Sequence, residues 1–242
     1  MNEKQIKLRE VSYEVKGKKI LENIDFEIGE GDRIAVCGPN GAGKSTLMNL
    51  MLNIPRFAFS KKTDKVQGKI ENTLFDIKNY QDVNVHLQHS RISYNLYLTV
   101  GELLNLCLGN HISEELLEKL KLKDKMHCLL RNLSGGEMQK LNIFLVISTN
   151  PKVIFLDEMT SGLDYESKKE IVSYIHQYIK KNDCTLVFVT HYLEEILQLA
   201  DKICFLKDGR IVDQGRVADL FFKYSVEEGN IEALYEEVIG CE

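Results

Sequence analysis

The sequence predicts an α/β fold with a mostly parallel core sheet, an antiparallel β subdomain and an inserted helical subdomain. Short apolar runs at residues 34–37, 153–156 and 186–189 are typical of buried parallel strands. A helical stretch at 166–181 separates the last two runs, and a strand–helix–strand unit implies a parallel sheet. The leucine-rich stretch from residue 99 to about 130 has helical character, which indicates the helical insertion.

The other elements can be predicted from local pattern. Residues 6–28 are expected to form two antiparallel strands around a polar turn, because their apolar residues mostly alternate with polar ones. A helix is expected over 45–52 and another over 133–147. The Asp-Gly pair at 208–209 predicts a hairpin turn. The tail from 216 to 242 is acidic and helical in character.

Composition narrows the class of protein. The 242 residues are 44% hydrophobic and 28% charged, which is ordinary for a soluble globular protein and excludes disorder. The net charge of −5 argues against a nucleic-acid partner, whose binding surface is usually basic. No apolar run approaches the roughly 20 residues of a membrane-spanning helix. Residues 1–8 are too polar for the core of a signal peptide. We therefore expect neither a membrane-spanning helix nor a signal peptide.

The six cysteines show no metal-binding spacing. No two of them form a CxxC pair, so the pattern of a zinc ribbon is missing. Cys37, Cys184 and Cys204 lie in or beside apolar strand-like runs. We therefore expect buried free thiols, as in a protein of a reducing compartment.

A glycine-rich loop follows the first buried strand and fits the pattern G-x-x-x-x-G-K-[ST]. Its glycines let backbone N–H groups curl around phosphates, and the start of the following helix favours negative charge. Lys44 would reach the β- and γ-phosphates of a nucleotide, and Ser45 would hold Mg²⁺. The residues expected to bind nucleotide are Gly38, Pro39, Asn40, Gly41, Ala42, Gly43, Lys44, Ser45 and Thr46.

Two acidic residues end the apolar strand at 153–156. In a phosphate-loop protein, Asp157 can reach Mg²⁺, usually through water. Glu158 can act as a general base that activates the attacking water. The alternative is a strand that simply ends at a solvated turn, which the presence of the phosphate loop disfavours.

The segment Leu133-Ser134-Gly135-Gly136-Glu137 precedes a strongly apolar helix. Ser134 and Glu137 have the S-x-x-E spacing of a capping box. Two glycines between them are unusual, because glycine destabilises a helix. They are explained if another group approaches the backbone closely, and a helix N-terminus of this kind is a good phosphate receptor.

With these motifs in this order, the sequence resembles an ATP-binding cassette (ABC) ATPase, specifically a stand-alone nucleotide-binding subunit, over about residues 4–220. The segment LSGGE matches the signature of that family. The resemblance implies that Tyr13 stacks on adenine and that Gln88 links the Mg²⁺ site to the helical subdomain. It also implies that His191 contacts the γ-phosphate. The loop that would cross the dimer interface is Ser161, Gly162, Leu163 and Asp164.

The resemblance further implies a single ABC ATPase domain over 1–242, with ATP and Mg²⁺ as cofactors. Its core with the β subdomain would be 1–88 and 150–215, its helical signature subdomain 89–149, and its helical tail 216–242. The implied catalytic residues are Glu158, His191, Lys44 and Gln88, and the implied Mg²⁺ ligands are Ser45, Gln88 and Asp157.

Two such chains would then form a head-to-tail dimer, with each ATP between the phosphate loop of one chain and the LSGGE segment of the other. Binding of ATP would close this dimer and hydrolysis would release it. Met159 and Lys140 depart from the family, which usually has Pro and Arg there, but neither change removes a catalytic group.

A cassette without a membrane span implies a separate transmembrane permease subunit, and a place on the cytoplasmic face of the cell membrane. Apolar residues after Gln88 are expected to line a groove for a short helix of that permease: Ile92, Tyr94, Leu96, Tyr97 and Leu98. The compact helical subdomain favours an exporter. The alternative is a soluble ABC ATPase outside transport, such as a scaffold for iron–sulfur cluster assembly. A guanine-specific phosphate-loop GTPase is disfavoured, because no Asn/Thr-Lys-x-Asp motif is present.

Overall fold

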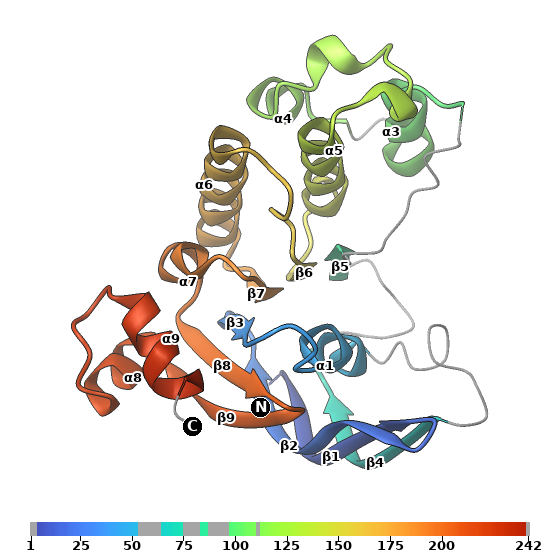
Figure 1. Ribbon diagram of the computed structural model, residues 1–242. Coiled ribbons are helices and arrows are strands. Elements are labelled where there is room, and N and C mark those ends of the chain that lie inside the picture. Colours follow the sequence, from blue (N-terminus) through green and yellow to red (C-terminus); the bar gives the residue numbers. More distant parts are fainter. Residues whose placement is uncertain (1–3, 53–63, 75–82, 87–96, 110–111, 241–242) are drawn as a thin grey trace. The chain divides into compact units, whose positions relative to one another are not determined.

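The computed structural model describes residues 4–52, 64–74, 83–86, 97–109 and 112–240 (Figure 1). These residues form two compact units, each with its own strands and helices. The first unit is Met1–Tyr80 with Thr185–Glu242, and the second is Gln81–Cys184. Within the described ranges, no helix has both the length and the apolar character that a membrane crossing requires.

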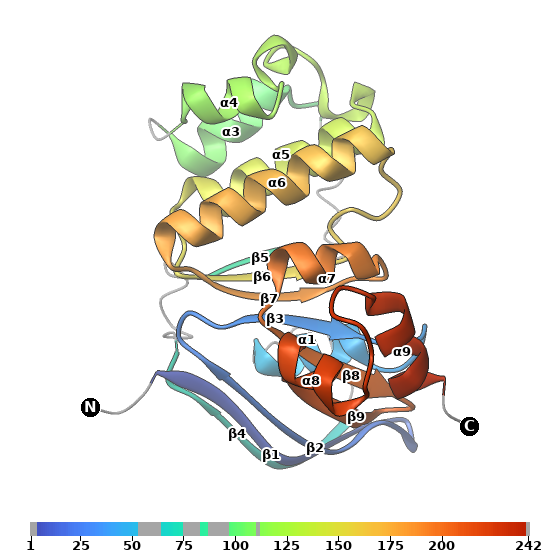
Figure 2. The ribbon, with the colours of Figure 1, turned by 90° about the vertical axis from the view of Figure 1, so that its left-hand side faces the viewer.

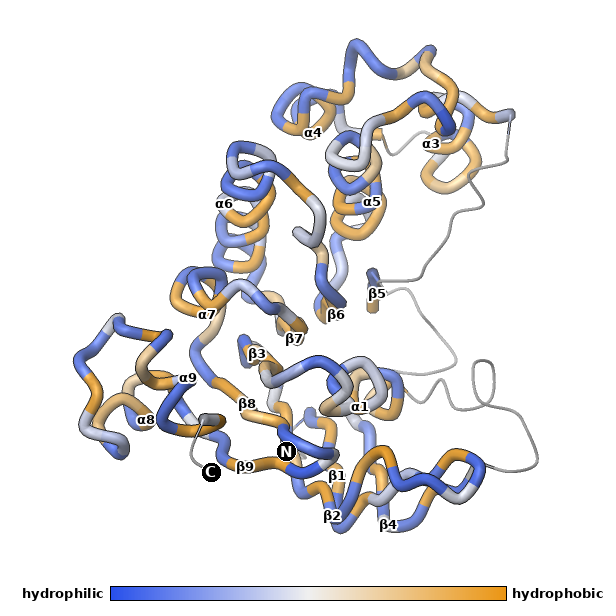
Figure 3. The backbone as a smooth tube through the Cα atoms, in the orientation of Figure 1, coloured by the Kyte–Doolittle hydropathy of each residue, from blue (hydrophilic) through white to orange (hydrophobic). Residues whose placement is uncertain are grey.

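The first unit contains a three-stranded antiparallel sheet in the order β2-β1-β4. This confirms the antiparallel pair predicted over 6–28, and buried and exposed positions alternate along most of β2. Figure 3 shows hydrophobic and hydrophilic residues along the same strands. The third strand was not expected, because its sequence is mostly polar and none of its described side chains is fully buried. The strands are β1 (Gln5–Val15), β2 (Lys18–Gly29) and β4 (Asp64–Asn72).

The first unit also contains the strand that leads into the phosphate loop. That strand, β3, lies between β7 and β8 and runs parallel to both, as predicted for a buried core sheet. The Asp-Gly pair turns β8 back into β9 as an antiparallel hairpin, with positive φ at Asp208 and Gly209. The strands are β3 (Arg33–Cys37), β7 (Thr185–Val189), β8 (Lys202–Lys207) and β9 (Arg210–Arg216).

The described residues of the first unit also form four helices, of which α8 and α9 pack beside the β8–β9 hairpin (Figure 1). The tail is helical as predicted, and the Lys207 ammonium donates to the backbone oxygen of Ile239 at 3.0 Å near the end of α9. The helices are α1 (Lys44–Met51), α7 (Leu193–Leu199), α8 (Val217–Lys223) and α9 (Ile231–Ile239).

In the second unit, the part of the chain that the structure describes forms two parallel strands, β5 and β6, and four α-helices. The leucine-rich stretch predicted to be helical forms α3 and α4, and α5 and α6 lie side by side (Figure 2). Lys140 of α5 donates to Glu170 of α6 at 2.7 Å and joins these two helices. The elements are β5 (Val83–His86), α3 (Val100–Leu108), α4 (Glu114–Lys119), α5 (Gly135–Ser148), β6 (Val153–Asp157) and α6 (Tyr165–Asn182), with short 3₁₀ turns at Lys123–Lys125 and Leu130–Asn132.

Three of the described cysteines are buried as predicted, whereas Cys107 is exposed and Cys128 is partly exposed. Cys37, Cys184 and Cys204 are buried thiols that take part in no disulfide. Burial raises the pKa of the Cys184 thiol to about 12, so it stays protonated at neutral pH. These thiols act as small apolar side chains in the cores of their units.

Candidate nucleotide-binding site

The phosphate loop connects β3 to α1, and the lysine of the motif, Lys44, is the first residue of that helix. Lys44 is 5% exposed, and its ammonium donates to the backbone oxygens of Gly38 at 2.8 Å and Pro39 at 2.9 Å. Helix α1 begins after Gly43 with no side-chain cap, so the N–H groups of its first turn are available to an anion. Ser45 stands in this first turn and is partly exposed.

Two glycines of the loop are required by close packing. A Cβ on Gly38, whose φ is +149°, would lie 1.8 Å from the backbone oxygen of Leu206 on β8. A Cβ on Gly43, whose φ is +102°, would lie 2.8 Å from the side chain of Leu21. The turn after β8 also holds the loop, because the N–H of Gly209 donates to the Ala42 oxygen at 3.0 Å. The Asp-Gly hairpin therefore helps to fix the shape of the phosphate loop.

His191 lies at the same edge of the sheet as this loop. Strands β3 and β7 are parallel with Val36 opposite Val189, so the residues after each strand emerge at one edge. His191 itself is exposed, whereas Thr190 before it is 2% exposed. The structure thus brings together two of the predicted site elements, the phosphate loop and the histidine.

Tyr13 does not fit the role that the resemblance implied. It lies in the middle strand of the three-stranded sheet, opposite Leu21 and Val66, and is 1% exposed. A ring buried to this extent presents no face on which adenine could stack. The structure therefore does not support Tyr13 as the adenine-stacking residue, and sequence pattern alone could not distinguish a buried strand aromatic from an exposed one.

The acidic pair ends strand β6 in the second unit. Asp157 is 2% exposed, whereas Glu158 is partly exposed and has a φ of +51°. This left-handed conformation is uncommon for a residue other than glycine, and such strain is typical of functional positions. It turns the chain sharply, so that the two neighbouring carboxylates differ in their access to solvent.

The capping box predicted in the LSGGE segment is confirmed. The N–H of Glu137 donates to the Ser134 hydroxyl at 3.2 Å, and the N–H of Ser134 donates to the Glu137 carboxylate at 2.8 Å. Lys125 contacts the same carboxylate at 2.7 Å, and this ion pair lowers the pKa of Glu137. Helix α5 therefore begins at a fixed, well-satisfied turn whose Ser134 and Gly135 are exposed.

The two glycines of this segment have different surroundings. A Cβ on Gly135 would meet no atom within 4 Å, so this position faces open space. A Cβ on Gly136 would lie 3.4 Å from the Ser167 hydroxyl and 3.7 Å from the Leu163 side chain. The segment thus packs against the predicted interface loop, whose last residue, Asp164, caps α6 through the N–H of Ser167 at 2.9 Å. The structure brings these two motifs together within the second unit.

The second unit also contains a buried side-chain contact that the sequence did not indicate. His86, at the end of β5, shares a 2.9 Å hydrogen bond with the side chain of Gln139 on α5. Burial lowers the pKa of His86, so its imidazole is neutral at physiological pH. Gln88, two residues further on, lies outside the described residues, as do Ile92, Tyr94 and Leu96.

Comparison with known proteins gives results that agree with this geometry. The family model for "ABC transporter" matches residues 21–161. A methionine import ATP-binding protein of Helicobacter acinonychis is 31% identical over 225 residues, which cover 90% of this chain and 68% of that protein. A xylose import ATP-binding protein of Thermoanaerobacter pseudethanolicus is 30% identical, covering 88% of this chain. This chain spans only 44% of the length of that xylose protein.

Among solved structures, the ATP-binding subunit of an ABC transporter superposes with a TM-score of 0.77 at 20% identity. The match covers 96% of this chain and 98% of that one, and at this identity it concerns the fold. Strand β3, the loop around Lys44 and helix α1 define a phosphate-loop nucleotide-binding fold. The chain belongs to the ABC transporter family, whose ATP-binding proteins are ATPases.

Proposed function

We propose that this chain binds and hydrolyses ATP as the nucleotide-binding subunit of an ABC transporter. The relatives named above, both ATP-binding proteins of transport systems, support this over an ABC ATPase outside transport. The observation that carries the proposal is the start of α5, where Ser134 and Gly135 are exposed beside open space. The chain thus has a phosphate loop and, far along the sequence, a second helix N-terminus suited to phosphate.

In the proposed reaction, each ATP lies between the phosphate loop of one subunit and the LSGGE segment of another. Glu158 accepts a proton from the attacking water while the water oxygen bonds to the γ-phosphorus. The bond from that phosphorus to the bridging oxygen breaks, and ADP leaves with the oxygen. Lys44 and His191 stabilise the charge on the transferred phosphoryl group, and Ser134 contacts it from the second subunit.

The residues present fit the Mg²⁺ that we expect with ATP. Ser45 offers a hydroxyl at the start of α1, and Asp157 offers a buried carboxylate at the end of β6. With the amide of Gln88, these are oxygen donors, which Mg²⁺ prefers. When bound, the ion neutralises charge on the β- and γ-phosphates.

The proposed partners are a second cassette subunit and a transmembrane permease, which would hold the chain at the cytoplasmic face of the membrane. Two exposed apolar side chains of the second unit support permease docking: Tyr97 is 79% exposed and Leu106 is 73% exposed. The Arg131 guanidinium lies 5.0 Å from the centroid of the Tyr97 ring and orients it. For the direction of transport, the relatives named for methionine and xylose import favour import over the export that we expected from the sequence.

Phosphate release from ATP tests the enzymatic part of the proposal. We expect Mg²⁺-dependent hydrolysis by the purified chain, and its loss in Lys44→Ala. Lys180→Ala, which removes an exposed lysine from α6, should retain the wild-type rate. Equal rates in the wild-type and Lys44→Ala proteins would refute the proposed site.

Co-purification tests the transport part. Co-expressed with a candidate transmembrane permease, the chain should be recovered with membranes, and Tyr97→Ala should weaken that recovery. Phe222→Ala, which removes an 89% exposed ring from the first unit, is the matched control. Recovery that is unchanged by Tyr97→Ala would contradict docking through this surface.

A further inference from the structure

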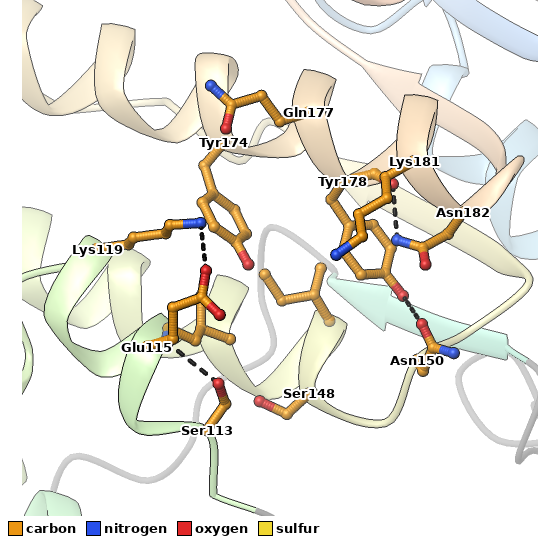
Figure 4. Close-up of a pocket in the computed structure, with 12 residues that line it drawn as sticks. Ser113, Glu115, Lys119, Ser148, Asn150, Tyr174, Gln177, Tyr178, Lys181 and Asn182 are labelled. Atoms are coloured by element: carbon orange, nitrogen blue, oxygen red, sulfur yellow. Dashed lines mark hydrogen bonds and ion pairs between the residues drawn. The ribbon is translucent and has the colours of Figure 1, made fainter.

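The second unit has a pocket of about 310 Å³ between α4, the carboxyl end of α5, and α6 (Figure 4). Its apolar lining includes Leu116 and Ile147, which are 6% and 4% exposed. The half-buried rings of Tyr174 and Tyr178 extend into it from α6. This volume is at the lower end of the range for small-molecule sites. Two aliphatic and two aromatic side chains form one part of the lining, and the other eight of its twelve residues are polar or charged.

The charge of the lining is positive. Lys119 on α4 and Lys181 on α6 lie on opposite sides of the pocket (Figure 4). Among the described lining residues, Glu115 is the only acid, and its carboxylate pairs with Lys119 at 2.8 Å. Two lysines and one glutamate give the lining a net charge of +2 − 1 = +1. Lys181 is exposed and forms no salt bridge within the described part of the chain. The pKa of Glu115 is lowered mainly by Lys119 and, to a smaller extent, by the charge of Lys181, so one ammonium already neutralises this carboxylate and the other can pair with an anion.

A hydrogen bond holds the ring of Tyr178 in place. The Tyr178 hydroxyl donates to the Asn150 side chain at 3.0 Å, and the Asn182 amide donates to the backbone oxygen of Tyr178 at 2.8 Å. Burial raises the pKa of Tyr174 and of Tyr178, so both phenols are neutral at physiological pH and add no negative charge. The pocket therefore offers two neutral aromatic rings, one of them held by a hydrogen bond, beside a cationic group.

We propose that this pocket binds a small organic anion with a flat aromatic body, of the class of aryl carboxylates. The ring of the ligand lies against Tyr174 and Tyr178 above Leu116 and Ile147, and its carboxylate pairs with the ammonium of Lys181. An organic cation is disfavoured by the net positive charge of the lining. All of these residues belong to the second unit, whereas the phosphate loop belongs to the first, so this is a separate site.

Binding of indole-3-acetate to the full chain, measured by calorimetry, tests the proposal. The neutral isostere indole-3-acetamide measures the contribution of charge. We expect the carboxylate to bind the wild-type protein, and the amide to bind at least about fivefold more weakly. Lys181→Met should weaken binding of the carboxylate by a similar factor without changing that of the amide.

Lys180→Met is the matched control, because Lys180 is the exposed neighbour on the same helix and does not line the pocket. It should bind both ligands as the wild type does. Tyr174→Leu removes the ring and keeps the charge, so it should weaken both ligands. Absence of binding by the wild-type protein, or equal affinity of the wild-type and Lys181→Met proteins for indole-3-acetate, would overturn the proposal.

Discussion

The hydroxyl of Thr190 donates a 2.6 Å hydrogen bond to the carboxylate of Glu195 on α7. The same hydroxyl oxygen accepts a 2.9 Å bond from the N–H of Tyr192. Thr190 and Glu195 are 2% and 3% exposed, so the bond between them is shielded from water. Together these bonds hold the loop that presents the exposed His191 at the edge of the sheet.

Loss of the Thr190 hydroxyl should therefore reduce turnover more than ATP affinity. Thr190→Val keeps the shape of the side chain but frees the His191 loop, and we expect kcat to fall by about tenfold or more because small displacements of catalytic groups are costly. The KM for ATP should change by less than about twofold, since the phosphate loop is intact. Steady-state ATPase kinetics measure both values.

Two controls separate positioning of His191 from loss of stability. Glu194→Gln changes an exposed acid on the same helix and should have no effect. In a His191→Ala background, Thr190→Val should cause no further loss of kcat, because the side chain that it positions is absent. If the losses of kcat caused by Thr190→Val and His191→Ala add in full, Thr190 does not position His191.

The open space around Gly135 predicts opposite effects on stability and dimerisation. Gly135→Ala should fit the single chain without a clash and raise the free energy of unfolding by up to about 1 kcal/mol, because alanine favours a helix. It should weaken ATP-dependent dimerisation, because the added methyl group occupies the surface proposed to receive phosphate. Denaturant unfolding and analytical ultracentrifugation with ATP measure the two effects. If the variant dimerises as well as the wild type, the phosphate of ATP does not approach the backbone at Gly135.

The phosphate loop should tolerate substitution unequally at its glycines. Gly38→Ala places a methyl group against the Leu206 oxygen, and we expect it to lower the free energy of unfolding by at least about 2 kcal/mol. Gly41→Ala meets open space but keeps a φ of +82°, so its cost should be limited to about 1–2 kcal/mol of backbone strain. Urea unfolding of the two variants compares these costs. Equal stability would mean that the contact with β8 does not constrain the loop.

Acidification should weaken the ion pair at the start of α5. The lowered pKa of Glu137 means that its contribution is complete above the usual value of 4.5 and is lost as the pH falls through the lowered value. Glu137→Gln should therefore destabilise the protein at pH 7 by about 0.5–1 kcal/mol, and this difference should shrink below about pH 4.5. Chemical unfolding between pH 7 and 4 measures it, with the exposed Glu228→Gln as control. A difference that grows on acidification would contradict the ion pair.

Features set by neighbouring residues were predictable from the sequence. The capping box of Ser134 and Glu137, the turn at Asp208 and the phosphate loop each need only a short segment with a specific backbone conformation. Three features were not predictable in this way. The burial of Tyr13 depends on strands on both sides of it, and β4 is polar because it is an edge strand. His86 and Gln139 are 53 residues apart, and no local pattern indicates their contact.

The central claim is that this chain is an ATPase whose two phosphate-binding segments act across a dimer. Glu158→Gln tests it most directly, because the amide keeps the shape of the side chain and cannot accept the proton of the attacking water. We predict that this variant binds ATP, forms a stable ATP-dependent dimer by analytical ultracentrifugation and releases no phosphate. A variant that hydrolyses ATP at the wild-type rate, or that binds ATP and remains a monomer, would contradict the account.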